Sequence, residues 1–262
     1  MAEQSDPQSS DQGGIPAATV VIFRHGRKGE PPQILMQVRN RNLAFAGGMA
    51  VFPGGRVDPA DHALAATLDV SDADEAAHRV AVVRETLEET GLVLGIRGAV
   101  DAQSAAAARK MLLAKEKLGP VLEAFDWTLA LDDLVPFARW FPKNEKLSRV
   151  FDTRFYLADI GTGAVEIEVD AGENTRLFWT SATGALADAD RGEIDVIFPT
   201  RRNLERLAQF DSFEDARAHA EAVPVRTIIP YIEEGPEGRF LCIPPDCGYP
   251  VSSVLLEDVR RG

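Results

Sequence analysis

The chain contains few cysteines and no long apolar run. Its 262 residues include two cysteines, Cys242 and Cys247, and no further cysteine pair and no histidine pair accompanies them. A structural zinc site takes about four such ligands, so we interpret the two as ordinary thiols. No apolar stretch approaches the roughly 20 residues that span a bilayer, and the N-terminus lacks the layout of a secretory signal. We therefore expect a cytoplasmic protein with no membrane span.

Positive charge is also scarce. The chain has 28 lysines and arginines against 41 aspartates and glutamates, which gives a formal net charge of −13. A general nucleic-acid binder needs a basic face for its phosphate contacts, so this balance argues against a nucleic-acid partner. It leaves room for a local basic pocket that takes a small polyanion.

The pattern along the chain predicts strands and helices without regular alternation. Residues 1–14, rich in Ser, Gln, Asp and Gly, are typical of a disordered tail, and 15–262 are expected to form one domain. Strands next to isolated helices favour an α+β sandwich. The expected strands are 17–24, 33–39, 49–52, 92–96, 134–141, 150–160, 165–169 and 177–180, and the expected helices are 72–90, 102–117, 200–209 and 212–221.

The segment RETLEETGL, which begins at Arg84, carries the strongest chemical signal. On a helix, Glu85, Glu88 and Glu89 fall at positions i, i+3 and i+4, so their carboxylates share one face. Like charges at this spacing cost a few tenths of a kcal/mol per pair, and the helix dipole disfavours anions in the last turn. A hard divalent cation such as Mg²⁺ or Mn²⁺ would reverse that cost. A solvated acidic face is the alternative interpretation.

This segment resembles the second half of the Nudix box, and Phe52-Pro53-Gly54-Gly55 resembles the entry to that motif. Thr86 stands where the family usually has an apolar residue. The family places about thirteen residues between the box glycine and arginine, whereas 28 separate Gly55 from Arg84, so we expect an insertion at about 59–74. The upstream box glutamate should lie eight residues before Arg84, where the chain has Ala76. Glu75 and Asp58 are imperfect substitutes, and the choice between them stays open.

An interrupted box is similar to that of the Nudix branch which contains the animal peroxisomal coenzyme A diphosphatase. The likeness lies in VFPGGRVDPAD at 51–61, RVFDTRF at 149–155 and PTRRNL at 199–204, and it runs from about 17 to 213. The resemblance implies a Nudix α/β/α sandwich around a mixed β-sheet. We expect additional helices near 102–118 and 200–222.

The same resemblance implies roles for the acidic cluster. Glu85, Glu88 and Glu89 would hold the divalent ions, and Glu85 or a neighbouring carboxylate such as Glu88 would help deprotonate the attacking water. Arg84 would hold the first glutamate in position through a charge-assisted hydrogen bond. The alternative for Arg84 is a plain i,i+4 pair with Glu88. Glu173 is the candidate for a further metal-binding carboxylate from a distant loop, against the alternative of a surface residue.

The substrate signal is a partial match to the coenzyme A pattern of the family. LMQVR at 35–39 and GMAVFPGG at 48–55 fit in part, but the position of the second arginine is occupied by Ala44, with Arg41 close by. Arg39 and Arg41 could pair with the 3′-phosphate of coenzyme A, and Gly54 and Gly55 would let the backbone approach the ligand. The alternative is that Arg39 merely ends a strand.

These observations predict metal-dependent hydrolysis of a diphosphate bond in a nucleotide derivative, with coenzyme A or acyl-coenzyme A as the first candidate substrate. ADP-ribose or a dinucleotide is the alternative substrate. A Nudix-fold protein that binds a nucleotide without cutting it is the alternative function, favoured by the missing upstream glutamate and opposed by the retained acidic cluster. The expected partner is a small-molecule nucleotide, and a homodimer is left open.

Overall fold

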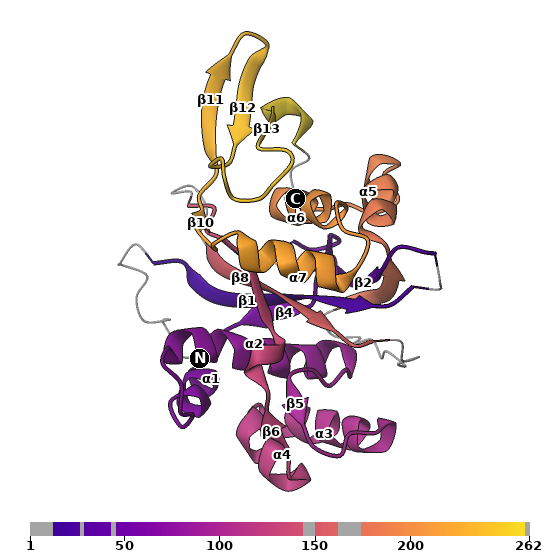
Figure 1. Ribbon diagram of the computed structural model, residues 1–262, viewed down its shortest axis with the longest axis vertical. Coiled ribbons are helices and arrows are strands. Elements are labelled where there is room, and N and C mark those ends of the chain that lie inside the picture. Colours follow the sequence, from indigo (N-terminus) through magenta and orange to yellow (C-terminus); the bar gives the residue numbers. More distant parts are fainter. Residues whose placement is uncertain (1–12, 27–28, 43–45, 144–149, 162–173, 260–262) are drawn as a thin grey trace, which may run out of the picture.

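A mixed eight-stranded sheet forms the centre of the molecule in the computed structural model, which describes residues 13–26, 29–42, 46–143, 150–161 and 174–259 (Figure 1). The strand order is β10-β7-β8-β1-β2-β3, with β4 paired to β1 and β9 paired to β2. Most of the expected tail, 1–12, and the expected strand 165–169 lie outside the described residues. The strands are β1 (Ile15–Arg24), β2 (Gln33–Arg39), β3 (Ala50–Val51), β4 (Gly54–Arg56), β7 (Val135–Trp140), β8 (Phe151–Asp159), β9 (Asn174–Thr180) and β10 (Thr227–Ile228).

Strand β1 lies inside this sheet and is buried along most of its length. It runs parallel to β8 and antiparallel to β2 and β4, which makes the sheet mixed. A strand that is covered on both faces needs apolar residues at successive positions, and the run Val20 to Phe23 supplies them. This explains why the segment is a continuous apolar run rather than an alternating one.

Helices cover both faces of the sheet (Figure 1). Apolar side chains form one buried cluster on the α2 side and a second on the α6 side. The predicted α+β fold, an α/β/α sandwich around a mixed sheet, is confirmed. One layer contains α1 (Pro59–Ala65), α2 (Ala73–Thr90), α3 (Ala102–Lys115) and α4 (Leu118–Phe125), and the other contains α5 (Ala182–Asp190), α6 (Phe198–Leu207) and α7 (Phe213–Ala222).

Helix α2 ends at the predicted residue and begins one residue after the predicted start, directly after the capping residue Asp72. The Asp72 side chain accepts a hydrogen bond from the backbone N–H of Glu75, and Gly91 ends the helix with a φ of 76°. Val83 and Leu87 are buried in the core cluster, so the acidic residues take the other side of the helix. The apolar face thus fixes the direction in which the carboxylates project.

The segment 59–74, where the sequence predicts an insertion, contains a helix in its first half. Asp58 begins α1 through a capping box with Asp61, and Pro59 occupies the first turn, where its missing N–H costs nothing. Ala65 is buried in the same core cluster as α2. The first residues of this segment therefore form a short helix that belongs to the packed layer.

The expected strand 92–96 is wrong for most of its length. Leu92 and Leu94 are buried, but the chain pairs as a strand only at Ile96 and Arg97. Gly95 has a φ of 58°, which breaks the extended conformation before the ladder begins. The remaining short elements here are β5 (Ile96–Arg97), its antiparallel partner β6 (Thr128–Leu129) and the 3₁₀ turn η1 (Leu131–Asp133).

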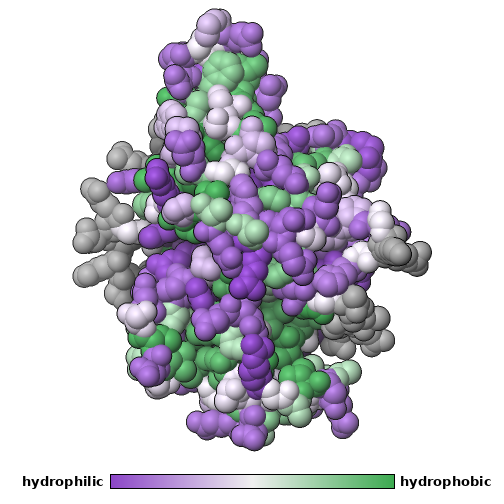
Figure 2. Space-filling model, in the orientation of Figure 1, coloured by the Kyte–Doolittle hydropathy of each residue, from purple (hydrophilic) through white to green (hydrophobic). Residues whose placement is uncertain are grey.

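A small antiparallel sheet near the C-terminus projects from the sandwich (Figure 1). Figure 2 shows apolar side chains gathered on this projection, where Tyr231 is 45% and Ile232 48% exposed. Cys242 and Cys247 are both buried free thiols. None of the described helices is long and apolar enough to cross a membrane. The elements are β11 (Tyr231–Gly235), β12 (Gly238–Cys242), β13 (Ser253–Leu255) and the 3₁₀ turn η2 (Leu256–Asp258).

Candidate functional site

Three carboxylates of α2 come together where this helix faces β4. The side chains of Glu85 and Glu88 are 14% and 19% exposed, and Glu89 is 2% exposed. A solvated acidic face would leave all three carboxylates in water, and this burial contradicts that interpretation. The helix instead directs its charges into a partly enclosed space.

Arg84 joins these carboxylates into one network. Its Nη1 donates to Oε1 of Glu85 at 2.9 Å and to Oε2 of Glu88 at 3.0 Å. Its Nε and Nη2 donate to the carboxylate of Asp61 at 3.0 and 2.9 Å, and Nη2 also donates to the carbonyl of Arg56. The arginine side chain is 5% exposed. Arg84 is therefore the centre of a buried clamp rather than one half of a surface i,i+4 pair.

Asp61 is the residue that the sequence reasoning missed. It is 1% exposed and binds Arg84 through both carboxylate oxygens. The two substitutes considered do not take this place, because Glu75 binds Arg154 at 2.7 Å and Asp58 lies 3.7 Å from Arg84. Counting back from Arg84 leads to Ala76, whereas counting forward from Gly55 leads to Asp61, six residues on. The family spacing, counted forward from Gly55, would therefore have found the residue.

Two glycines allow the close approach of β4 to its neighbours, Gly54 to strand β1 and Gly55 to helix α2. Gly54 has a φ of +146°, and a Cβ there would lie 2.3 Å from the carbonyl oxygen of Ala18. A Cβ on Gly55 would lie 2.3 Å from Oε1 of Glu85. The backbone N–H of Gly54 donates to Oε2 of Glu89 at 2.9 Å. Gly55 thus lies beside the helix that carries Glu85, as the interrupted motif predicts.

Two amide side chains from neighbouring strands enclose Glu89. Gln37 on β2 donates its Nε2 to Oε2 of Glu89 at 2.9 Å, and Asn174 on β9 places its Nδ2 3.5 Å from Oε1. Gln37 and Asn174 are 0% and 1% exposed. Neither residue was identified from the sequence, because isolated amides in two strands form no recognisable motif.

Burial raises the pKa of each carboxyl group in the cluster. For Glu85, burial is the main cause, the Arg84 guanidinium opposes it, and the charges of Glu89 and Glu88 add to it. For Glu89, burial outweighs the hydrogen bonds from Gln37 and Gly54, which lower its pKa. Burial also raises the pKa of Glu88 against the lowering by Arg84. The cluster therefore holds its negative charge weakly until a cation offsets the loss of water.

The predicted substrate-binding arginines lie at the same end of β2. The positive charge of Arg39 lowers the pKa of Glu89, and the Arg39 Nε is buried without a hydrogen-bond partner among the described residues. Arg41 is exposed and packs over Gly48, whose Cβ position is 3.2 Å from Cγ of the arginine. Glu173, the expected distant carboxylate, lies outside the described residues. Its role stays a prediction.

Arg109 of α3 contacts the end of α2 that carries the acids. It is 8% exposed, and its Nε donates to the backbone carbonyl of Glu88 at 3.0 Å. The last turn of α2 has no basic residue of its own. A cation from a neighbouring helix therefore satisfies one of the carbonyls at the negative end of the helix dipole.

The cluster has the chemistry of a site for a hard divalent cation. Carboxylate and amide oxygens are the ligands that Mg²⁺ and Mn²⁺ prefer. A second group that could hold a cation, His25, Asp159 and Glu214, has its ligand atoms within 4.8 Å of one another. His25 follows the end of β1, six residues beyond Thr19, which pairs with Gly54, so this group lies roughly 20 Å along the strand from the α2 acids.

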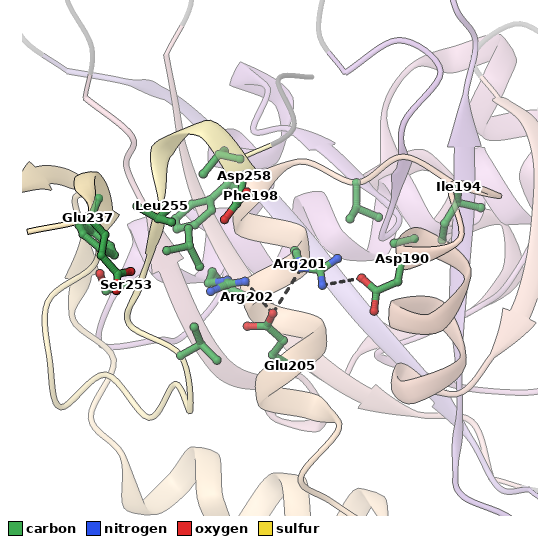
Figure 3. Close-up of a pocket in the computed structure, with 16 residues that line it drawn as sticks. Asp190, Ile194, Phe198, Arg201, Arg202, Glu205, Glu237, Ser253, Leu255 and Asp258 are labelled. Carbon is green, nitrogen blue, oxygen red and sulfur yellow. Dashed lines mark hydrogen bonds and ion pairs between the residues drawn. The ribbon is translucent and has the colours of Figure 1, made fainter.

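A cavity of about 560 Å³ lies elsewhere, between α6 and the projecting C-terminal sheet (Figure 3). Arg201 and Arg202 enter it from α6, and both pair with Glu205 of the same helix. Ser253 and Leu255 lie on the opposite wall. None of the residues predicted to form the site lines this cavity, and α6 and α2 lie on opposite faces of the sheet (Figure 1).

Comparisons with known proteins identify a family model and similar solved structures. The family model described as the NUDIX domain matches residues 15–145. A NUDIX hydrolase from Alicyclobacillus acidocaldarius is 26% identical, with a TM-score of 0.68 over 80% of this chain and 97% of that chain. The NUDIX domain of Shewanella oneidensis NrtR, solved with ADP ribose, is 13% identical, with a TM-score of 0.43 over 78% of this chain and 96% of that chain. No curated protein matches the chain.

Proposed function

Because this chain belongs to the NUDIX domain family and is a hydrolase of pyrophosphate bonds, we propose that it cuts the diphosphate of a nucleotide derivative. The reaction depends on divalent cations held by the carboxylates of Glu85, Glu88 and Glu89. The observation that carries the proposal is the buried pair of Arg84 and Asp61. Arg84 fixes the carboxylates of Glu85 and Glu88 next to the Gly54-Gly55 turn.

The residues around Glu89 fit a cation. The amide oxygens of Gln37 and Asn174 are buried, and neither has a hydrogen-bond donor in the described part of the chain. Buried acceptors of this kind are rarely left alone in a folded protein, so they indicate a partner that the chain itself does not supply. A divalent cation with its bound waters is such a partner.

A divalent cation held by Glu85, Glu88 and Glu89 would polarise the phosphoryl oxygens and lower the pKa of the attacking water. Residues of the chain hold the carboxylates that this step needs in fixed positions. In this proposal Glu85, which lies against Gly55, accepts the proton of the water, and Arg84 holds Glu85 and Glu88 in fixed orientations through its hydrogen bonds. The hydrogen bonds from Gly54 and Gln37 hold Glu89. The water oxygen forms a bond to one phosphorus, the bond from that phosphorus to the bridging oxygen breaks, and the second phosphate leaves with the bridging oxygen. The proton that the water loses passes to Glu85.

Coenzyme A or an acyl-coenzyme A is the substrate that the sequence favours within this class. Arg39 lies close enough to Glu89 to act on its charge, and Arg41 is exposed at the turn after β2. Guanidinium groups suit the phosphates of a polyanion, and an otherwise acidic protein needs such a local positive surface to bind one. The partial coenzyme A pattern at 35–39 and 48–55 supports the same choice.

A substrate screen tests the proposal. Coenzyme A, an acyl-coenzyme A, ADP-ribose and a dinucleotide are incubated with the protein and Mn²⁺ in H₂¹⁸O, and the products are identified by mass spectrometry. We expect coenzyme A to yield two phosphomonoesters, one of which carries a single ¹⁸O. Cleavage of ADP-ribose or the dinucleotide alone would replace the substrate assignment. Binding of a nucleotide without cleavage of any of the four would contradict the proposed catalysis.

A further inference from the structure

Two amide side chains touch both oxygens of one buried carboxylate. Gln37 and Asn174 come from β2 and β9, which are antiparallel neighbours with Arg39 opposite Asn174. Their N–H groups lie 2.9 and 3.5 Å from the two oxygens of Glu89, and the backbone N–H of Gly54 adds a third contact. Glu89 is therefore held on both sides by groups that carry no charge.

The orientation of both amides follows from this arrangement. An ionised carboxylate only accepts hydrogen bonds, so each amide must turn its nitrogen toward Glu89. The amide oxygens must then point elsewhere, and both are buried without a donor in the described residues. A buried acceptor without a donor costs free energy. A hydrophobic side chain of similar shape, or a side chain with only a donor, would avoid that cost because it has no acceptor oxygen. The structure thus retains two unpaired oxygens beside the acidic cluster.

We propose that Gln37 and Asn174 are positioning residues of the cation centre. Their nitrogens orient Glu89 as a ligand, and their oxygens accept hydrogen bonds from the water shell of the cation or bind it directly, as amide oxygens do for hard cations. Outer-shell partners of metal ligands fix the ligand's direction, and their removal typically weakens metal binding about 10- to 100-fold. The inference rests on the proposed function, because it takes Glu89 as a ligand.

The charge of Arg39 explains why the two side chains that contact Glu89, Gln37 and Asn174, are neutral amides. Its positive charge already acts on Glu89, and a second cation in contact with that carboxylate would compete with a divalent ion for it. An additional carboxylate would repel Glu89 in the absence of metal. Amides avoid both effects, since they hold the carboxylate without changing the net charge of the centre.

Mn²⁺ affinity is the direct test, and it requires no substrate. Isothermal titration with Mn²⁺ is carried out on the full chain and on Gln37→Met and Asn174→Leu, which keep similar shapes but remove the amides. Gln33→Met is the matched control, since Gln33 lies on the same strand and bonds Arg24 instead of Glu89. We expect affinity to fall about 10- to 100-fold in the two test variants and to stay unchanged in the control.

The outcomes separate this inference from the proposed function. Wild-type protein that binds no Mn²⁺ would contradict the proposed cation site itself. Wild-type protein that binds Mn²⁺, together with folded Gln37→Met protein of equal affinity, would remove Gln37 from the centre, and the same holds for Asn174. Far-ultraviolet circular dichroism confirms folding, and either variant gives an answer if the other does not fold. A merely structural role predicts a lower melting temperature with wild-type Mn²⁺ affinity, which would overturn the proposal.

Discussion

At the scale of single residues, the buried pair of Arg84 and Asp61 distinguishes this site from an ordinary acidic helix. Arg84 is almost fully enclosed, and burial alone would lower the pKa of its guanidinium. The hydrogen bond to Asp61 and the charge of Glu85 outweigh burial and raise that pKa. The Arg84 guanidinium therefore stays positively charged. Its carboxylate partners offset the cost of burying that charge.

Replacing Asp61 tests this clamp. Asp61→Asn keeps the shape of the side chain but removes its charge, and Arg84 keeps Glu85 and Glu88 as partners. Removing one partner of a buried ion pair costs roughly 3–5 kcal/mol, and the remaining partners place the expected loss at the lower end of this range. Urea unfolding measures it, with Asp58→Asn as the control because Asp58 lies 3.7 Å from Arg84 and is half-exposed. Equal stability of the two variants would show that Asp61 does not hold Arg84.

The raised pKa of Glu89 has a consequence for stability that depends on pH. A carboxyl group whose pKa is higher in the folded state than in the unfolded state stabilises the fold below its unfolded pKa, and this contribution is lost as the pH rises through the folded pKa. In chelator, Glu89→Gln should therefore melt at a higher temperature than wild type at pH 8. The difference should shrink toward zero near pH 5, where Glu89 is protonated.

Differential scanning fluorimetry at a series of pH values measures this difference. The comparison of two proteins cancels the other titrating groups, such as His78, whose pKa is lowered by burial. A difference that stays constant between pH 5 and pH 8 would mean that the charge of Glu89 costs the fold nothing. Added Mn²⁺ should reverse the order at pH 8, because only the wild type keeps the full set of carboxylates.

At the scale of elements, the end of α2 depends on α3. Arg109 is the cation that meets the carbonyl of Glu88, where the dipole of α2 is negative and three acids add to it. Interactions of this kind contribute up to about 2 kcal/mol in partly buried geometries. We expect Arg109→Met to lower the free energy of unfolding by about 1–2 kcal/mol.

Lys110→Met is the matched control for this change, because Lys110 is the next residue of α3 and is exposed. Urea denaturation of both variants measures the effect. Amide hydrogen exchange should locate the loss of protection in the last turn of α2 in Arg109→Met protein and in no other helix end. An equal loss in Lys110→Met would assign the effect to the general charge of α3.

The elements that the sequence predicted are those with a strong local pattern. Helix α2 has a capping aspartate, an apolar face and a terminal glycine, and its predicted and observed bounds differ by one residue at the start. Helices α4 and α5 were missed because glycine lies near the start of each, at Gly119 and Gly184, where it weakens a helical pattern. Helix α1 was missed because its short sequence has few large apolar residues and therefore resembles a polar loop.

At the scale of the whole molecule, the sandwich could be predicted because the segments 52–55 and 84–92 together resemble the Nudix box, which implies this fold. The amides of Gln37 and Asn174 could not, because they meet only after β2 and β9 pair. The projecting sheet was missed for a related reason, since β11 and β12 are mostly exposed and lack the alternation of a half-buried strand. Their turn, Gly235-Pro236-Glu237-Gly238, was the available signal.

The two layers of helices serve different surfaces of the molecule. Helices α1 and α2 carry the acidic site, whereas α5, α6 and the C-terminal sheet line the separate cavity (Figures 1 and 3). Changes in the second layer should therefore leave metal binding intact. Ser253→Ala, in the wall of the cavity, should bind Mn²⁺ with wild-type affinity in the same titration. A weaker affinity would show that the two faces of the sheet are energetically linked.

The rate of hydrolysis by Glu88→Gln and Glu89→Gln proteins at limiting Mn²⁺ tests the central claim most directly. Each substitution removes one charge, nearly preserves shape and relieves repulsion in the metal-free helix, so the fold should persist. We expect activity to fall by orders of magnitude, because the cation and its water are no longer held beside Glu85. Folded Glu89→Gln protein that hydrolyses its substrate at the wild-type rate would contradict the account and favour a plain acidic helix.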